Sequence, residues 1–460
     1  MKAASAVSTQ WIPLSGEVRK QVAQVLQAIV QRYKDPDQVR AQMKQVPGQV
    51  IEGKQVARWS DTSFSGGFTG ICVLMGQLDQ LYPDNGWDMV GHSYLQKIQQ
   101  VIEQQGIHTL SLYSGLAGIL LGVRALSRKN TRYQGMLDTL ASWFEEAVLN
   151  YVEICKNQWK EGQLRISQYD TIEGLTGIAR VVLAFSDRPQ MKIIWQRIVE
   201  VFHIFCGEKD YQGHRIPAWH ILSANQFLEH EKVQYPNGNF NLGLSHGISG
   251  PLAFLSLSQL QGMTTEAMRA DLRRLTEWIC RWRVSGEAGT LWPGRVAVEE
   301  VLQGELHPSS IRDPWDSWCY GVPGIARSIW LAGQAMHNQE WSAIGLQAYV
   351  DIENRIQTMG GLTASTLCHG IGGLLHMVQR MYSDTGHVKL GAIRDELVVA
   401  VLDKYAAESK FGYYDEYFVN GKYEQVDEAG FLTGTAGVAL VLASLLCEES
   451  PDWDMALLIR

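Results

Sequence analysis

The stretch GLAGILLGVRAL at residues 115–126 begins with two glycines three positions apart and continues with aliphatic residues almost without interruption. Residues at i and i+3 lie on one helix face, where glycines let a neighbouring backbone approach closely. The stretch is apolar on nearly all sides, which is typical of a helix buried on every face. It therefore predicts an interior helix that begins at a Gly-x-x-Gly motif.

Seven Gly-x-x-Gly motifs each open a run of small and aliphatic residues, and amphipathic stretches such as residues 18–33 and 267–282 lie between these copies. The copies are at residues 67–70, 115–118, 174–177, 247–250, 321–324, 370–373 and 434–437. A linear solenoid or a closed ring of helical hairpins would satisfy this alternation, and helices that are buried all round favour the ring. We predict an all-α fold, an α/α toroid with seven inner and seven outer helices, as a single domain over residues 1–460.

The two longest gaps between copies hold sequence of a different kind. Near 207–241 and 285–318 the chain is rich in Gly, Pro, Trp and short β-branched runs. These features are typical of loops and short strands rather than helices. We expect irregular or β insertions at both places.

Composition narrows the class of protein. The chain has 460 residues, with 40 Lys and Arg against 48 Asp and Glu and a net charge of −8, so it lacks the basic face of a nucleic-acid binder. Its 7 cysteines include no CxxC pair, which indicates reduced thiols in the cytoplasm. The N-terminus has no apolar signal-peptide core, and Pro, Asn and Gly interrupt the two long uncharged stretches. We expect a soluble cytoplasmic protein that binds no nucleic acid.

Residues with metal-binding or proton-transferring side chains precede the first glycine in three copies. These are His246, Cys319, and the adjacent pair Cys368 and His369. Equivalent positions in a ring of repeats lie at the same end near the axis, so these side chains are expected to converge. Two Cys and one His match the ligand count of a catalytic zinc with an open fourth position.

Each of these residues also has a simpler interpretation. A buried Cys is more often a small hydrophobic residue than a ligand. His246 could be a fourth ligand, a general acid or base, or a core histidine. Asp170, one helical turn before Gly174, could cap a helix or orient a catalytic group.

Four strings resemble the lanthionine synthetase C-like family, and among its members the stand-alone class I lanthipeptide cyclases. They are NLGLSHGISG at 241–250, SWCYGVPG at 317–324, LCHGIGG at 367–373, and Tyr169-Asp170 followed by GLTG at 174–177. The resemblance runs from about residue 60 to the C-terminus. From its 460 residues we expect the chain to lack the large dehydratase region of fused synthetases and to be the separate cyclase.

The resemblance implies a zinc-dependent enzyme that adds peptide Cys thiols to dehydroalanine or dehydrobutyrine and forms (methyl)lanthionine thioether rings. Cys319, Cys368 and His369 match the ligands of one Zn²⁺ per chain. His246 matches the acid/base, and Asp170 would orient it. In many relatives a catalytic Arg lies just ahead of the WCYG string, whereas Arg312 here lies at a wider separation.

The resemblance also implies the surroundings of the enzyme. The substrate would be a dehydrated precursor peptide, and a lanthipeptide dehydratase and an export transporter would be partners at the inner face of the membrane. A small SH2-like lobe would be built from one of the two long gaps.

Two alternatives from other classes remain open. One is another zinc enzyme on an α/α toroid that activates a substrate thiol, similar to a protein prenyltransferase. The other is a non-catalytic relative that binds glutathione or a peptide.

Overall fold

The computed structural model describes residues 10–311, 316–419 and 422–460, which fall into two compact units. The first unit comprises Met1–Ala141 and Leu362–Asp454, and the second comprises Ser142–Gly361 and Met455–Arg460. Helix α6 (Gln134–Lys160) runs from the first into the second. None of the helices formed by the described residues combines the length and apolarity needed to span a membrane.

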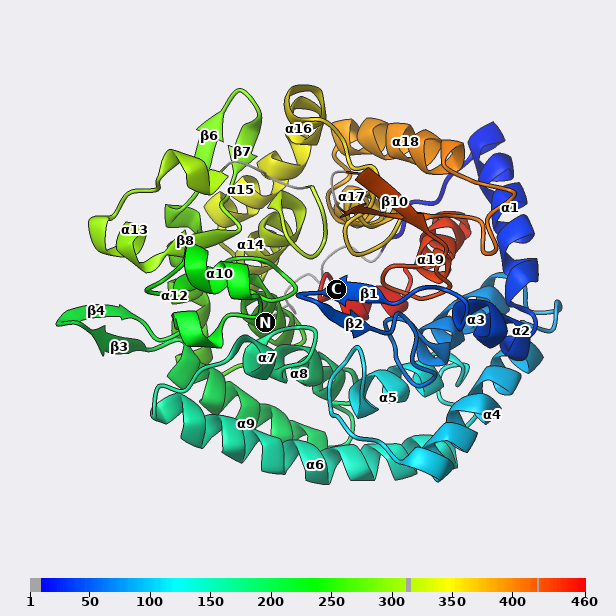
Figure 1. The fold of residues 1–460 in the computed structure, drawn as a ribbon, viewed down its shortest axis with the longest axis horizontal. Helices are drawn as coiled ribbons and strands as arrows, with labels where there is room; N and C mark the ends of the chain where they lie inside the picture. Colours follow the sequence, from blue (N-terminus) through cyan, green and yellow to red (C-terminus); the bar gives the residue numbers. More distant parts are fainter. Residues whose placement is uncertain (1–9, 312–315, 420–421) are drawn as a thin grey trace, which may run out of the picture. The chain divides into compact units, whose positions relative to one another are not determined.

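The first unit is built around four buried helices that each begin at a Gly-x-x-Gly motif (Figure 1). They are α3 (Phe68–Leu81), α5 (Leu116–Ala125), α17 (Ile371–Thr385) and α19 (Thr435–Leu446). Helix α3 packs against α5 and α19, and α19 packs against α17. Three longer helices cover them: α1 (Gly16–Val30) on α19, α4 (Trp87–Gln105) on α3, and α18 (Val388–Asp403) on α17.

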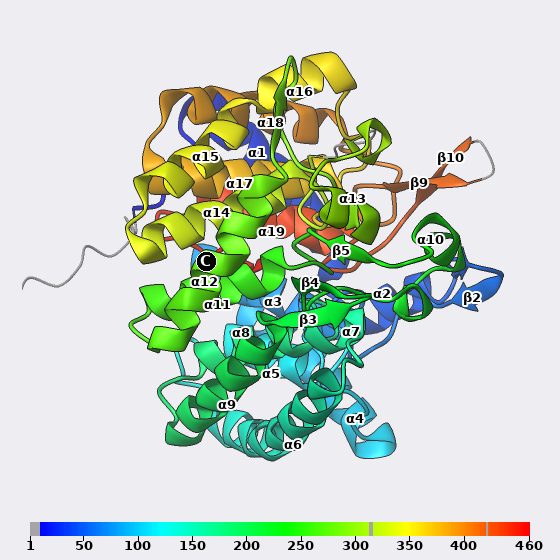
Figure 2. The ribbon, with the colours of Figure 1, turned by 90° about the vertical axis from the view of Figure 1, so that its left-hand side faces the viewer.

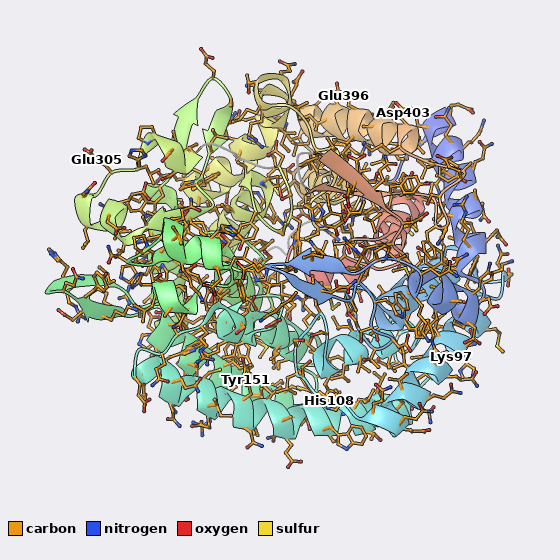
Figure 3. All side chains as sticks on the ribbon, viewed as in Figure 1. Lys97, His108, Tyr151, Glu305, Glu396 and Asp403 are labelled. Carbon is orange, nitrogen blue, oxygen red and sulfur yellow. The ribbon has the colours of Figure 1, made fainter. Side chains whose placement is uncertain are left out.

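The covering helices are amphipathic, as their sequence predicts. On α18, Leu397 and Val398 are buried, while Glu396 and Asp403 are exposed (Figure 3). The unit also contains the short helices α2 (Pro36–Met43) and η1 (Gln31–Tyr33) and two antiparallel hairpins. The hairpins are β1 (Gln49–Ile51) with β2 (Lys54–Val56), and β9 (Asp415–Val419) with β10 (Lys422–Val426), which extends from the helices in Figure 2.

The second unit repeats the same plan with three buried helices. These are α8 (Leu175–Ala184), α11 (Ser249–Leu260) and α14 (Val322–Met336), which are covered by α9 (Pro189–Phe205), α12 (Glu266–Arg281) and α15 (Gln339–Val350). Helix α11 packs against both α8 and α14. All seven motifs therefore begin a buried helix, as predicted.

The two long gaps contain the strands of the second unit. The first gap holds β3 (Glu208–Tyr211), β4 (His214–Pro217), η2 (Ser223–Asn225), α10 (Glu229–Gln234) and β5 (Asn239–Asn241). The second holds β6 (Val284–Gly286), β7 (Gly289–Leu291), β8 (Arg295–Ala297), α13 (Val298–Gln303) and η3 (Pro308–Ile311). Strands β5 and β8 pair antiparallel, which joins the two insertions, and each sheet of the described residues has two strands. Helices α7 (Ile166–Tyr169), α16 (Ile352–Met359) and η4 (Trp453–Leu457) complete the chain.

The second glycine of six of the seven motifs has a tighter constraint than helix packing alone. A Cβ on Gly118 would lie 2.2 Å from the carbonyl oxygen of Leu112, six residues earlier, and 2.8 Å from Cβ of Phe64. The same relation holds for Gly70 with Phe64 at 2.2 Å and for Gly437 with Phe431 at 2.0 Å. The segment that enters each helix thus folds back over its first turn, and only glycine leaves room for it.

We expect Gly118→Ala to lower the free energy of unfolding by about 1–3 kcal/mol, because the added methyl overlaps backbone that cannot move freely. Gly135 on α6 is the matched control, since a Cβ there would meet nothing within 4 Å. Gly135→Ala should leave stability unchanged or raise it by up to about 1 kcal/mol. Chemical denaturation of both variants measures the difference, and equal stabilities would contradict the fold-back constraint.

Candidate active site

Asp170 and His246 form a close pair within the second unit. Nδ1 of His246 lies 2.5 Å from Oδ2 of Asp170, whose side chain is fully buried, while the His246 side chain is 26% exposed. Asp170 follows α7, and His246 lies in the segment that enters α11. Because Nδ1 is engaged by the carboxylate, Nε2 is the nitrogen left to exchange a proton with a bound molecule.

The second oxygen of Asp170 performs the capping role that the sequence also allowed. Oδ1 accepts hydrogen bonds of 2.8 Å from the backbone N–H groups of Glu173 and Gly174, at the start of α8. Asp170 thus uses one oxygen for the helix and one for His246. Beside it, partial desolvation and the Asp170 charge raise the pKa of the Glu173 carboxyl.

Three further hydrogen bonds fix the backbone around this pair. The Tyr169 hydroxyl donates to the carbonyl of His246 at 2.9 Å. Thr171 donates from its backbone N–H to the carbonyl of Ser245 at 2.9 Å and from its hydroxyl to that of Leu244 at 2.7 Å. These hydrogen bonds join the segment that carries Asp170 to the segment that carries His246. The imidazole and the carboxylate therefore keep their orientation.

Cys319 lies in the segment that enters α14, next to the His246 segment. The backbone N–H and the hydroxyl of Ser245 donate to the carbonyl of Cys319 at 3.2 and 3.1 Å. The Cys319 side chain is partly exposed, and its Sγ lies 3.7 Å from the hydroxyl of Ser317. The structure therefore brings a partly accessible thiol and the His246–Asp170 pair into adjoining segments of one unit.

Tyr320 packs between these segments. A Cβ on Gly243 would lie 2.7 Å from the Tyr320 ring, so the glycine makes room for it. The Tyr320 hydroxyl accepts a 2.9 Å hydrogen bond from the side chain of Asn241. Burial raises the pKa of this phenol to about 12, so the ring is neutral near pH 7.

Cys368 and His369 lie in the first unit, in the segment that enters α17. Both are partly exposed, and their ligand atoms lie within 4.8 Å of each other. The backbone N–H of Cys368 donates to the carbonyl of Leu432 at 2.9 Å, which fixes the segment. A thiol and an imidazole are thus held side by side at the start of a buried helix.

A buried carboxylate that the sequence analysis missed supports His369. Nε2 of His369 lies 3.3 Å from Oδ1 of Asp415, the first residue of β9, whose side chain is fully buried. The same oxygen accepts hydrogen bonds from the hydroxyl of Thr366 at 3.2 Å and from the backbone of Glu416 at 3.0 Å. These hydrogen bonds hold the Asp415 carboxylate in place beside the imidazole.

The sequence analysis also missed further residues around His369 and Asp415. The Tyr417 ring lies 5.9 Å from the His369 ring, and the Arg58 guanidinium lies 4.4 Å above Tyr417. Nη1 of Arg58 pairs with the buried Glu428 at 2.6 Å. Burial, with the Asp415 and Glu428 charges, raises the pKa of the Tyr417 phenol. These residues lie outside the repeat register, and no sequence motif marks them.

The remaining predicted residue cannot be placed, since Arg312 lies outside the described residues. Each unit by itself holds donors of the types that bind metal ions: the Cys319 thiol in the second unit, and the Cys368 thiol with the His369 imidazole in the first. Thiolate is a soft ligand and imidazole a borderline one, and both types are common in zinc sites.

Comparisons with known proteins show what the whole chain is similar to. The chain is 26% identical over 421 residues to the nisin biosynthesis protein NisC of Lactococcus lactis subsp. lactis, covering 89% of this chain and 91% of that protein. A solved structure titled nisin cyclase matches with a TM-score of 0.76 at 22% identity, covering 97% and 98% of the two chains. This match confirms the predicted α/α-toroid fold class.

The family comparison covers nearly the whole chain, including every predicted site residue. The model of the lanthionine synthetase C-like proteins matches residues 58–458. The chain therefore belongs to the lanthionine synthetase C-like family.

Proposed function

We propose that this protein is a zinc-dependent lanthipeptide cyclase. It adds Cys thiols of a dehydrated precursor peptide to dehydroalanine or dehydrobutyrine in the same peptide and forms (methyl)lanthionine rings. The observation that carries the proposal is that Ser245 donates hydrogen bonds to the backbone carbonyl of Cys319, which holds the segment of the Cys319 thiol beside the segment of the His246–Asp170 pair, in a chain of this family. A proton-exchanging imidazole in a segment that adjoins a thiol suits thiol addition.

The donor set supports one zinc ion per chain, held by Cys319, Cys368 and His369. Three protein ligands leave a position for a substrate, as in catalytic zinc sites. The carboxylate of Asp415 beside His369 matches the carboxylate–histidine pairs that orient zinc-binding imidazoles. Zinc would supply a Lewis acid that keeps a substrate thiol deprotonated at neutral pH.

The chain's own residues account for the proton transfers. Addition forms a bond from sulfur to the β-carbon of the dehydro residue, while the α-carbon gains a proton and the thiol loses one. His246 Nε2 can deliver that proton and recover one from the next thiol, so peptide mass does not change. Asp170 holds Nδ1 and stabilises the imidazolium between the two transfers.

The finer parts of the proposal rest on the family resemblance. Arg312 would stabilise the enolate formed at the α-carbon. A dehydratase would supply the substrate and an exporter would remove the product, with the enzyme in the cytoplasm at the inner membrane face. The chain would act as one catalytic domain over residues 1–460.

We expect purified protein to contain about one zinc per chain, and Cys319→Ala or Cys368→Ala to lose most of it. Cys280→Ala is the matched control, because Cys280 is a partly exposed thiol on α12 whose pKa burial raises to about 12. That variant should keep its zinc. Elemental analysis after dialysis measures the content, and full occupancy in both ligand variants would refute the assignment.

Asp415→Asn should weaken zinc binding about 10- to 100-fold, because the imidazole loses the charge that orients it and increases its basicity. Competition with a chromophoric chelator measures the affinity. Asp403→Asn, at an exposed position of α18, provides the control and should bind zinc like wild type. An unchanged affinity in Asp415→Asn would show that this carboxylate does not support the ligand.

His246→Ala should keep its zinc and slow ring closure about 10²- to 10⁴-fold, because the α-carbon loses its proton donor. Asp170→Asn should also slow closure, yet it retains an oxygen for the N–H groups of Glu173 and Gly174. Asp170→Ala lacks that oxygen, and its unfolding free energy should fall by a further 1–3 kcal/mol, approximately.

The assay for these variants uses a dehydrated precursor peptide and counts remaining free thiols by alkylation and mass spectrometry. Wild-type protein should remove thiols without changing the mass of the unalkylated peptide. Wild-type rates in His246→Ala would exclude His246 from catalysis, and equal stability of both Asp170 variants would exclude the capping role.

A further inference from the structure

A phenylalanine in the first long insertion is exposed beside His246. Phe227 is 42% exposed, and its ring lies 5.1 Å from the His246 ring in an edge-on arrangement with an interplanar angle of 73°. Phenylalanine is normally among the most buried residues, because exposing it leaves a large apolar surface in water. An exposed aromatic ring against a candidate catalytic histidine is therefore a feature that folding alone does not explain.

The backbone on both sides of Phe227 is held in place. The side chain of Asn225 donates to the carbonyl of Leu164 at 2.9 Å, and the Gln226 side chain donates to the carbonyl of Ile221 at 3.2 Å. On the other side, the backbone N–H of Leu228 donates to the carboxylate of Glu231 at 3.4 Å. The ring is presented from an anchored segment rather than from a loose loop.

Tyr320 provides a second aromatic surface on His246. The two ring centroids lie 6.0 Å apart at an interplanar angle of 33°. Asn241 and Arg295, which are cross-strand partners, hold Tyr320 in place. The side chain of Asn241 donates to the Tyr320 hydroxyl at 2.9 Å. The Arg295 guanidinium lies 5.1 Å from the centroid of the Tyr320 ring. The imidazole thus has two aromatic neighbours that come from anchored segments.

We propose that Phe227 and Tyr320 form a subsite that holds the dehydroalanine or dehydrobutyrine residue under attack. This inference rests on the proposed function. A dehydro residue is planar, conjugated and uncharged, and flat π-systems pack well against aromatic rings. The Ser or Thr from which it derives is tetrahedral and carries a hydroxyl that such walls would desolvate without a partner. The subsite therefore favours dehydrated residues and places the α-carbon near His246 Nε2.

The test measures binding without turnover. The probe is a fluorescently labelled precursor peptide with every Cys alkylated, prepared in dehydrated and in undehydrated form. Wild-type protein should bind the dehydrated form more tightly, and Phe227→Ala should reduce this preference about 3- to 10-fold while zinc content stays constant. Phe227→Tyr keeps an aromatic ring and should retain the preference.

Leu222→Ala is the matched control, since Leu222 is 40% exposed in the same insertion. It should behave like wild type. With unalkylated dehydrated peptide, Phe227→Ala should raise KM by the same factor as it weakens binding and change kcat less. Should Phe227→Ala fail to fold, Phe227→Leu, which keeps the apolar volume without the ring, supplies the same comparison.

The outcomes separate this inference from the proposed function. If wild-type protein closes rings but Phe227→Ala keeps the full preference for the dehydrated peptide, the subsite assignment is wrong and the cyclase assignment stands. If wild-type protein closes no ring in a zinc-loaded state and shows no preference, the proposed function fails. A loss of preference that occurs equally in Leu222→Ala would also overturn the role of Phe227.

Discussion

The contact between the second glycine and a carbonyl oxygen six residues earlier, found in six of the seven motifs, is the constraint on which the rest of the structure depends. It forces the entering segment to fold back over the first turn of the buried helix, as Gly324 does with Trp318 and Gly373 with Leu367. The one or two residues before the first glycine are then fixed at the N-terminal end of that helix. His246, Cys319, Cys368 and His369 all occupy such positions, at the starts of α11, α14 and α17.

This placement suits the chemistry of the residues that stand there. The N-terminal end of a helix carries a partial positive charge, which favours anionic groups such as thiolates. The fold-back also limits how far these side chains can move, because the backbone on each side is tied by hydrogen bonds such as that from Cys368 to Leu432. A ligand set built this way loses little conformational freedom when it binds a metal ion.

The sequence predicted the site residues that stand one or two positions before the first glycine of a motif. Such positions can be recognised from the sequence alone, because the motif repeats. It predicted seven buried helices and the four reactive residues before them. It explained the glycines by contacts between helices and missed the contact with the segment that enters the same helix. For Asp170 it left a choice between capping and orienting, and the two oxygens of the carboxylate do both. Asp415 and Phe227 were missed, since one begins a hairpin and the other lies in an insertion, and neither stands at a repeat position.

The division between repeat positions and insertions has a physical consequence for specificity. The residues proposed for metal binding and proton transfer lie next to glycines whose contacts leave no room for a side chain, so their backbone positions are fixed by the fold. Phe227 lies in an insertion, where the side chains of Asn225 and Gln226 and the backbone N–H of Leu228 hold its segment. An insertion of this kind can exchange its exposed residues at little cost in stability, because exposed positions contribute little to packing. The position of Phe227 next to His246 can therefore vary with the peptide substrate, whereas Tyr320 and the groups proposed for the chemistry stay at positions that the repeat fixes.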